Sequence, residues 1–152
     1  MMRFRKATEN DITAIVEMLA DDELGGLRED FQIPLPEKYY QAFVNIENDN
    51  NQELMVVEDN DSEIIGTFQL SFIQYLTYEG GTRAQIEAVR IRKDKRDEGL
   101  GKIMFEWAIK RAKERKAHLL QLTTDKKRPM AINFYKELGF KSTHEGMKLH
   151  FD

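Results

Sequence analysis

Cysteine is absent from this chain of 152 residues, which also has only 3 prolines and 1 tryptophan. Without cysteine the chain has no disulfide, no thiolate metal ligand and no cysteine nucleophile. None of its apolar runs approaches the roughly 20 residues that a membrane-spanning helix needs. Residues 1–5 also lack the apolar core of a signal peptide. We therefore expect a cytoplasmic protein that has no membrane partner.

Strong net charge is also missing, since the formal value is −4 and gives no general attraction to nucleic acid. The charges are nevertheless uneven, because residues 17–30 are mainly acidic and residues 90–102 are rich in Arg and Lys. An acidic surface that attracts amines beside a basic surface that attracts anions would suit a two-substrate enzyme. Two solvated surfaces with unrelated roles are the alternative.

The hydrophobic pattern predicts one mixed α/β domain over residues 1–152, without a repeat or a linker. The expected strands cover residues 2–6, 53–58, 64–73, 84–91 and 119–123, with a further extended stretch over residues 140–151. The expected helices cover residues 12–19, a segment that starts at Pro36, and residues 99–116 and 129–138. Leu24-Gly25-Gly26 is expected to break the first helix, and Gly139 to cap the last one in a left-handed conformation.

The most informative segment is a basic loop that connects the strand ending at Ile91 to the helix beginning near Gly99. The first amides of a helix lack intrahelical partners, and the helix dipole favours an anion at that end. Gly99 and Gly101 would let a phosphate approach the backbone closely, and Arg96 and Lys102 would add charge. The alternative is a helix that begins with glycines and binds no ligand there.

Two other phosphate-binding motifs are excluded at this loop. The dinucleotide fingerprint needs a third glycine where this chain has Met104, and the P-loop sequence Gly-Lys-Ser/Thr is absent.

The remaining pattern, Arg96-Asp97-Glu98-Gly99-Leu100-Gly101, resembles motif A of the GNAT superfamily of N-acetyltransferases, Arg/Gln-x-x-Gly-x-Gly/Ala. Three further segments are similar to the same family in the same order. They are the opening residues 3–11, the hairpin with Ile65-Gly66, and Ala131-Ile132-Asn133-Phe134-Tyr135-Lys136-Glu137-Leu138-Gly139-Phe140. The resemblance implies a GNAT fold, in which a mixed sheet splays between the motif-A strand and the next strand and is flanked by about four helices.

The resemblance also implies acetyl-CoA as cosubstrate. A metal is not expected, because no His, Asp or Glu set has metal-ligand spacing. The backbone of Val89 and Ile91 would pair with the pantetheine arm. The pyrophosphate would lie against Arg96, Asp97, Glu98, Gly99, Leu100, Gly101 and Lys102. Asp97 departs from the glycine common in the family, and we expect Asp97 and Glu98 to point to solvent. Asn133 is a further candidate contact, and Arg128 either reaches a CoA phosphate or covers a basic surface.

Glu87 is the candidate general base. By strand alternation it shares a face with Gln85, Val89 and Ile91, which becomes apolar along the strand. Desolvation on such a face would favour proton uptake by the carboxylate. The alternatives are a glutamate in a surface ion pair, or a water chain that removes the proton instead.

Tyr135 is the candidate general acid. It lies on one stripe of the last helix with Ala131 and Leu138, where a tyrosine is commonly a core residue. The resemblance instead assigns it to protonation of the CoA sulfur. His144 is kept as a reserve base.

These observations predict transfer of an acetyl group to a primary amine, with a small molecule as acceptor. A protein N-terminus or lysine acetyltransferase and a non-catalytic acyl-CoA sensor remain the alternatives. Because members of the family commonly form dimers, a homodimer is one expected assembly.

Overall fold

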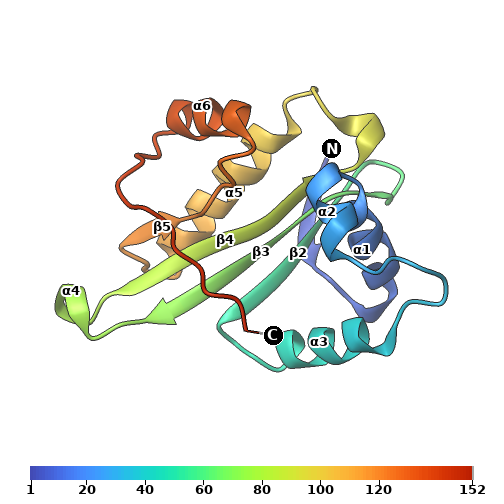
Figure 1. The fold of residues 1–152 in the computed structure, drawn as a ribbon, viewed down its shortest axis with the longest axis horizontal. Coiled ribbons are helices and arrows are strands. Elements are labelled where there is room, and N and C mark those ends of the chain that lie inside the picture. The colour runs from blue at the N-terminus through green and yellow to red at the C-terminus, as the bar shows by residue number, and fades with distance from the viewer. Residues whose placement is uncertain (152) are drawn as a thin grey trace. The chain divides into compact units, whose positions relative to one another are not determined.

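Five strands form one sheet in the order β1-β2-β3-β4-β5 in this computed structural model, which describes residues 1–151. Neighbouring strands from β1 to β4 are antiparallel, whereas β4 and β5 are parallel. The strands are β1 Arg3–Lys6, β2 Gln52–Glu58, β3 Ile64–Gln74, β4 Thr82–Ile91 and β5 Leu119–Gln121 (Figure 1). The predicted mixed sheet is therefore confirmed.

Four longer helices accompany the strands, as expected. They are α1 Ile12–Ala20, α3 Glu37–Glu47, α5 Leu100–Glu114 and α6 Pro129–Glu137. The shorter elements are the 3-10 helices η1 Glu9–Asp11 and η2 Lys93–Lys95, and the helices α2 Glu23–Arg28 and α4 Thr77–Gly80.

Helix α2 corrects the prediction that Leu24-Gly25-Gly26 is only a break. The Asp22 side chain caps the helix by accepting a hydrogen bond from the Gly25 amide. Gly25 is buried, and a Cβ at this position would collide with the Leu19 carbonyl at the end of α1. The glycine therefore allows α2 to pack closely against α1.

The chain divides into two compact units. Unit 1, Met1–Gln121, contains all five strands and every helix except α6. Unit 2 begins at Leu122 and contains α6.

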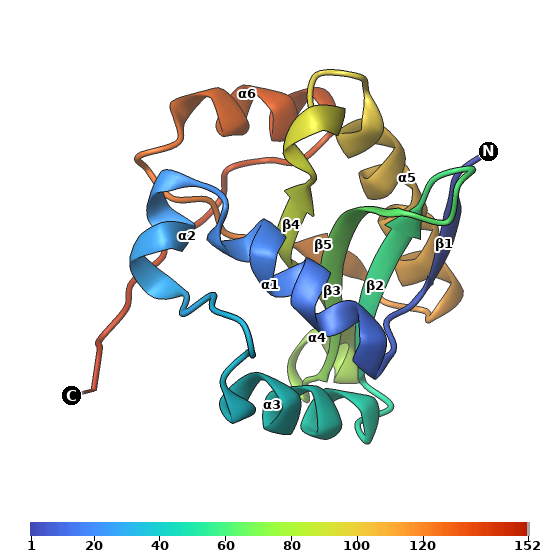
Figure 2. The same ribbon diagram turned by 90° about the vertical axis from the view of Figure 1, so that its right-hand side faces the viewer.

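In unit 1, α1 and α5 lie on opposite faces of the sheet (Figure 2). On the α5 face, Phe68 packs against Phe4 and Trp107, with ring centroids 6.3 and 5.7 Å away. The other buried apolar residues of β3 and β4 on this face are Leu70, Phe72, Ala84 and Ile86. On the α1 face, the core cluster is Ile12, Val16, Leu35 and Phe43.

One carboxylate is buried within the α5 face. Glu53, only 2% exposed, accepts hydrogen bonds from Arg111 Nη2 at 2.6 Å and from Arg115 Nη1 at 3.0 Å. Burial alone would raise the pKa of Glu53, but the Arg111 hydrogen bonds and the charges of both arginines hold it below its ordinary value. The ion pairs therefore fasten the C-terminal half of α5 to β2.

Unit 2 is organised around α6, where Tyr135 packs edge-on against Phe134 and Phe140. Gly139 has φ 101°, which confirms the predicted left-handed cap. The expected strand over residues 140–151 is wrong, because these residues form no ladder with another strand among residues 1–151. Their alternating apolar residues, Met147, Leu149 and Phe151, are exposed instead.

Within residues 1–151, every helix is too short or too polar to span a lipid bilayer.

Candidate functional site

A β-bulge interrupts β4 immediately after the candidate base. Thr67 pairs with Arg90 and Gln69 pairs with Glu87, so that Ala88 and Val89 together oppose a single residue of β3. Ala88 has φ 55°, an unusual left-handed conformation for alanine. Because the extra residue shifts the alternation, the predicted common face of Gln85, Glu87, Val89 and Ile91 is wrong beyond Glu87.

Glu87 is exposed, and its Oε1 accepts a hydrogen bond of 2.8 Å from Gln85 Nε2. The expected apolar, desolvated surroundings are therefore not found, since Glu87 and the neighbouring Ala88 are both exposed. The alternative of a surface ion pair is not found either, since no Lys or Arg of residues 1–151 forms a salt bridge with Glu87. Glu87 is thus an accessible carboxylate fixed by one amide.

The bulge lies where β4 loses one of its two neighbours. β5 pairs with β4 only from Arg83 to Gln85, whereas β3 accompanies β4 to Ile91. Within residues 1–151 no strand borders the other side of β4 beyond Gln85. This opening is the splay expected from the resemblance, and it leaves the Val89 and Ile91 backbone beside an open edge. Their carbonyls accept hydrogen bonds from Arg90 Nη1 and Arg96 Nε, at 2.9 and 3.2 Å.

The N-terminus of α5 follows at the end of the basic loop. Gly99 is its N-cap with φ 82°, a conformation that favours glycine, and no side chain caps the helix. Leu100 is buried and fastens the first turn, whereas Gly101 is half-buried and Lys102 is exposed. The uncapped amides of this turn can therefore receive an anion, as a pyrophosphate requires.

Asp97 adopts φ 63°, in the left-handed region. Glycine enters this region without strain, and Asp and Asn enter it more readily than other residues do. The backbone conformation thus explains why an aspartate can stand where the family commonly has glycine. Asp97 and Glu98 are both exposed, as expected.

The acidic and basic segments noted in the sequence are joined by ion pairs. Arg96 Nη2 lies 3.3 Å from Asp21 Oδ2, and Arg90 Nε lies 3.4 Å from Asp22 Oδ2. Arg96 also donates to the Asp21 backbone carbonyl at 3.2 Å. The two segments are therefore not wholly free for ligands, because part of their charge is neutralised internally.

The remaining predicted site residues belong to unit 2. Arg128 is the N-cap residue of α6 and is half-buried, while Asn133 is exposed on the helix. Tyr135 is half-buried between its two aromatic neighbours. His144 lies in the exposed segment after α6, where its Nδ1 is 2.6 Å from Thr143 Oγ1.

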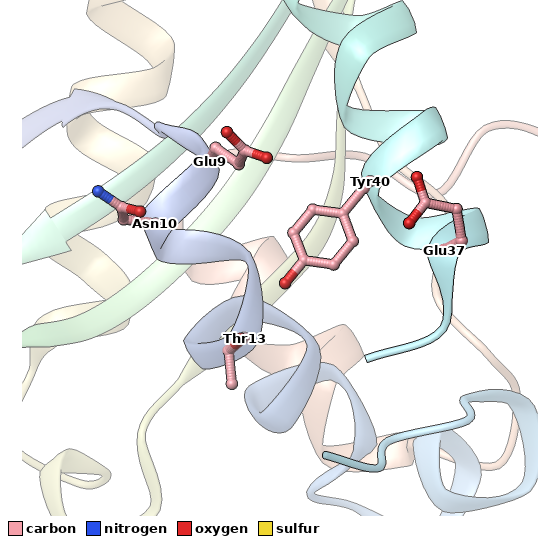
Figure 3. A pocket seen from close by; sticks show the side chains of 5 residues that line it. All are labelled: Glu9, Asn10, Thr13, Glu37 and Tyr40. Carbon is pink, nitrogen blue, oxygen red and sulfur yellow. The ribbon is translucent and has the colours of Figure 1, made fainter. Parts of the chain in front are cut away.

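A cavity of about 530 Å³ lies elsewhere in unit 1, between the start of α1 and the start of α3. Figure 3 shows the Tyr40 ring directed from α3 toward this gap. The lining residues are Glu9, Asn10, Thr13, Glu37 and Tyr40. None of them is a predicted catalytic or cofactor residue. Within residues 1–151, no group of three or more His, Cys, Asp and Glu side chains is placed to hold a metal ion.

The uncharged polar side chains beside Glu87 were not among the predicted site residues. On the α1 face, Gln69, Ser71 and Gln85 alternate with buried apolar residues that point toward α5. The signal was present in the sequence as polar residues at every second position of two adjacent strands. Only the strand register identifies which of these residues are neighbours.

The fold and the site thus define an α/β protein with an uncapped helix N-terminus beside an opened sheet. The model of the Acetyltransferase (GNAT) family matches residues 17–140, and the chain belongs to this family. The resemblance noted in the sequence is therefore confirmed.

Two solved structures are similar to this chain over almost its whole length. A transcriptional regulator from Bacillus halodurans C-125 is 51% identical with a TM-score of 0.95, covering 99% of this chain and 100% of that one. A predicted acetyltransferase with acetyl-CoA from Clostridium acetobutylicum is 27% identical with a TM-score of 0.76, covering 99% and 96%.

A third structure shares the fold at lower identity. Glucosamine-6-phosphate N-acetyltransferase from Arabidopsis thaliana is 21% identical with a TM-score of 0.79, covering 100% of this chain and 99% of that one. No curated protein matched the sequence.

Proposed function

We propose that the protein transfers the acetyl group of acetyl-CoA to the primary amine of a small molecule. The observation that carries this proposal is the position of Glu87, an exposed carboxylate at the point where β4 parts from β5. The family uses acetyl-CoA, and the similar chain from Clostridium acetobutylicum is described with it.

The residues of unit 1 fit the cosubstrate. The uncapped first turn of α5 supplies amides for a pyrophosphate, and Lys102 and Lys95 lie in the same basic segment. The open edge of β4 at Val89 and Ile91 suits the amides of an extended pantetheine arm. Arg96 contributes less than a free arginine would, because it is already paired with Asp21.

The chemistry requires proton transfers at the amine and at the sulfur. An alkylammonium, with a pKa of about 10, loses a proton to Glu87, and the free amine then forms a bond to the acetyl carbon. The carbon–sulfur bond breaks, and the departing thiolate takes up a proton. Tyr135 is proposed as the donor of the proton to sulfur, the role that the family resemblance assigns to it. The nitrogen gives up a second proton, which replaces the one donated to sulfur, and Glu87 releases the first proton to solvent.

The direct test is release of CoA from acetyl-CoA in the presence of single amines. Amino sugars, amino acids, polyamines and peptides should be supplied separately, with the acetylated product identified by mass spectrometry. We expect one class of small amine to stimulate CoA release well above the rate of hydrolysis. A peptide as the best acceptor would instead indicate a protein acetyltransferase.

A second candidate is an acyl-CoA-binding sensor without catalysis. The 51% identity to a protein described as a transcriptional regulator favours considering it. A sensor would bind acetyl-CoA but release no CoA with any amine, and Tyr135→Phe would then change nothing in the release assay. An enzyme would lose rate in Tyr135→Phe while still binding acetyl-CoA in a thermal-shift measurement.

A further inference from the structure

A row of four uncharged polar side chains crosses the sheet on the α1 face. Gln52 of β2 is the register partner of Ser71 of β3, Ser71 of Gln85 of β4, and Gln85 of Gln121 of β5. Adjacent strands thus place four hydrogen-bonding side chains side by side across unit 1.

Hydrogen bonds fix the orientation of these side chains. Ser71 Oγ donates to Gln52 Oε1, and Gln121 Nε2 donates to Gln85 Oε1, each at 2.8 Å. Gln85 Nε2 in turn donates to Glu87 Oε1 at 2.8 Å. The row is therefore linked directly to the proposed catalytic carboxylate.

The row keeps hydrogen-bonding capacity for a ligand. A glutamine amide has two donor hydrogens and an oxygen that accepts two hydrogen bonds. Gln121 Oε1 accepts no side-chain hydrogen bond from residues 1–151, and Gln52 Nε2 donates none. All four side chains are half-buried, so the row is partly exposed to solvent.

The charge distribution around the row disfavours a second cationic group on the ligand. The four side chains of the row carry no charge. The next row, two residues further along β4, contains Leu54, Gln69 and Glu87, and within residues 1–151 Glu87 is its one ionisable group. In the row below, Arg83 lies over the rings of Tyr75 and Tyr78, at 4.6 and 5.2 Å. A ligand reaching from Glu87 along this face would therefore meet neutral polar groups and then a positive charge.

We propose that this row, called here the amide row, binds the hydroxyl groups of a polyhydroxylated primary amine whose amino group lies at Glu87. The inference rests on the proposed acetyl transfer and names its acceptor class. Glu87 and Gln85 are two residues apart, so the two rows are separated by about 6.7 Å along the strand. One sugar ring is of comparable size, and its hydroxyls match the free donors and acceptors of the row.

The discriminating acceptors are glucosamine and cyclohexylamine. Both carry one primary amine on a six-membered ring, but only glucosamine has hydroxyls. A site built to form hydrogen bonds rejects an analogue that cannot form them. We expect kcat/KM for CoA release to be at least about 100-fold higher with glucosamine. Equal kcat/KM values for the two amines would overturn the inference. A higher kcat/KM for spermidine or a peptide than for glucosamine would also overturn it.

Gln121→Leu tests the row itself without touching Glu87. One lost hydrogen bond should raise KM for glucosamine about tenfold while kcat changes less than twofold. Cyclohexylamine should be used as well as before, or better. Gln41→Leu, an exposed position on α3, is the matched control and should behave like the wild type. Equal effects of Gln121→Leu on both amines would contradict the proposed contact.

Binding separates this inference from the proposed function. If no amine stimulates CoA release, acetyl transfer is disproved. The amide row is then tested separately, by using NMR to measure binding of glucosamine to the CoA-saturated protein. Binding that disappears in Gln121→Leu but persists in Gln41→Leu would support the row. Absence of glucosamine binding to the wild type would disprove it.

Discussion

The two faces of the sheet in unit 1 differ in what their side chains do. The α5 face is closed and apolar around Phe68, and its one carboxylate, Glu53, is neutralised by two arginines. The α1 face is buried near α1 but becomes polar and half-exposed from Gln69 to Gln121. Glu87 lies on this second face, with Gln85 as its hydrogen-bond partner.

This difference separates stability from chemistry within the same strands. Neighbouring residues such as Phe68 and Gln69 point to opposite faces, so replacing them should affect different properties of the protein. Substitutions on the α5 face should lower the free energy of unfolding. Substitutions on the polar part of the α1 face should change ligand binding or turnover instead.

The largest effect is expected for Glu87→Gln, which keeps the shape but removes the proton acceptor. Loss of a general base should lower amine-dependent kcat about 10²–10⁴-fold. The acetyl-CoA dissociation constant and the melting temperature should stay at wild-type values, because Glu87 is exposed. Initial-rate kinetics measure kcat, and calorimetry measures the dissociation constant and the melting temperature. Glu47→Gln at the end of α3 is the control. Unchanged kcat would remove Glu87 from the mechanism.

Phe68→Ala and Gln69→Ala compare the two faces at adjacent positions. Phe68 is fully buried, so its truncation should cost about 3–5 kcal/mol of unfolding free energy. Gln69 is half-buried on the polar face, and its truncation should cost less than about 1.5 kcal/mol, the typical value of its one hydrogen bond. Urea unfolding followed by circular dichroism measures the difference. Similar losses of unfolding free energy for both variants would contradict the proposed difference in function between the two faces.

Much of the fold was predictable because the α5 face imposes a regular pattern. Leu70, Phe72, Ala84 and Ile86 alternate with polar residues, and the glycines and prolines mark most element ends. The bulge was not predictable, because Ala88 carries no signal for a left-handed conformation and only the pairing with β3 reveals it. The bulge is also why the surroundings of Glu87 differ from the expected apolar face.

Other departures have local causes. Gly25 was interpreted as a helix breaker, although it is required for close packing of α2 on α1. The alternation in residues 140–151 indicated a strand, but a strand also needs a hydrogen-bonded partner. The basic loop before α5 was recognisable because its glycines and its place before a helix are local features. The amide row was missed because its members are 14 or more residues apart in sequence.

The buried carboxylate makes stability depend on pH. Glu53 has a pKa below its unfolded value of about 4.3. Its stabilising contribution to the free energy of unfolding is therefore fully present above that pH. The contribution is lost as the pH falls through the lower folded pKa. Glu53→Gln should therefore be less stable than the wild type at pH 7, by about 1–3 kcal/mol, and the gap should narrow below about pH 4.

Melting temperatures from pH 7 to pH 3 measure this gap. Glu87→Gln serves as the exposed control, and its curve should run parallel to that of the wild type. A constant difference between Glu53→Gln and the wild type over the whole range would contradict the ionised, arginine-paired state of Glu53.

The smallest effect is expected at Asp97, the residue that departs from motif A. Asp97→Gly removes a carboxylate beside the proposed pyrophosphate site and places glycine at φ 63°. One exposed charge of this kind changes binding by roughly 0.3–1 kcal/mol, so acetyl-CoA should bind about two- to fivefold more tightly. Calorimetric titration at low salt measures the change, and weaker binding would indicate that Asp97 itself contacts the ligand.

Hydrogen–deuterium exchange with and without acetyl-CoA tests where the cosubstrate binds. We expect it to bind at the open half of β4 and the first turn of α5. Peptides covering residues 87–103 should therefore be protected by acetyl-CoA, whereas peptides from β1 and β2 should exchange as before. Protection confined to other parts of the chain, or no protection at saturating acetyl-CoA, would contradict the assignment of this site.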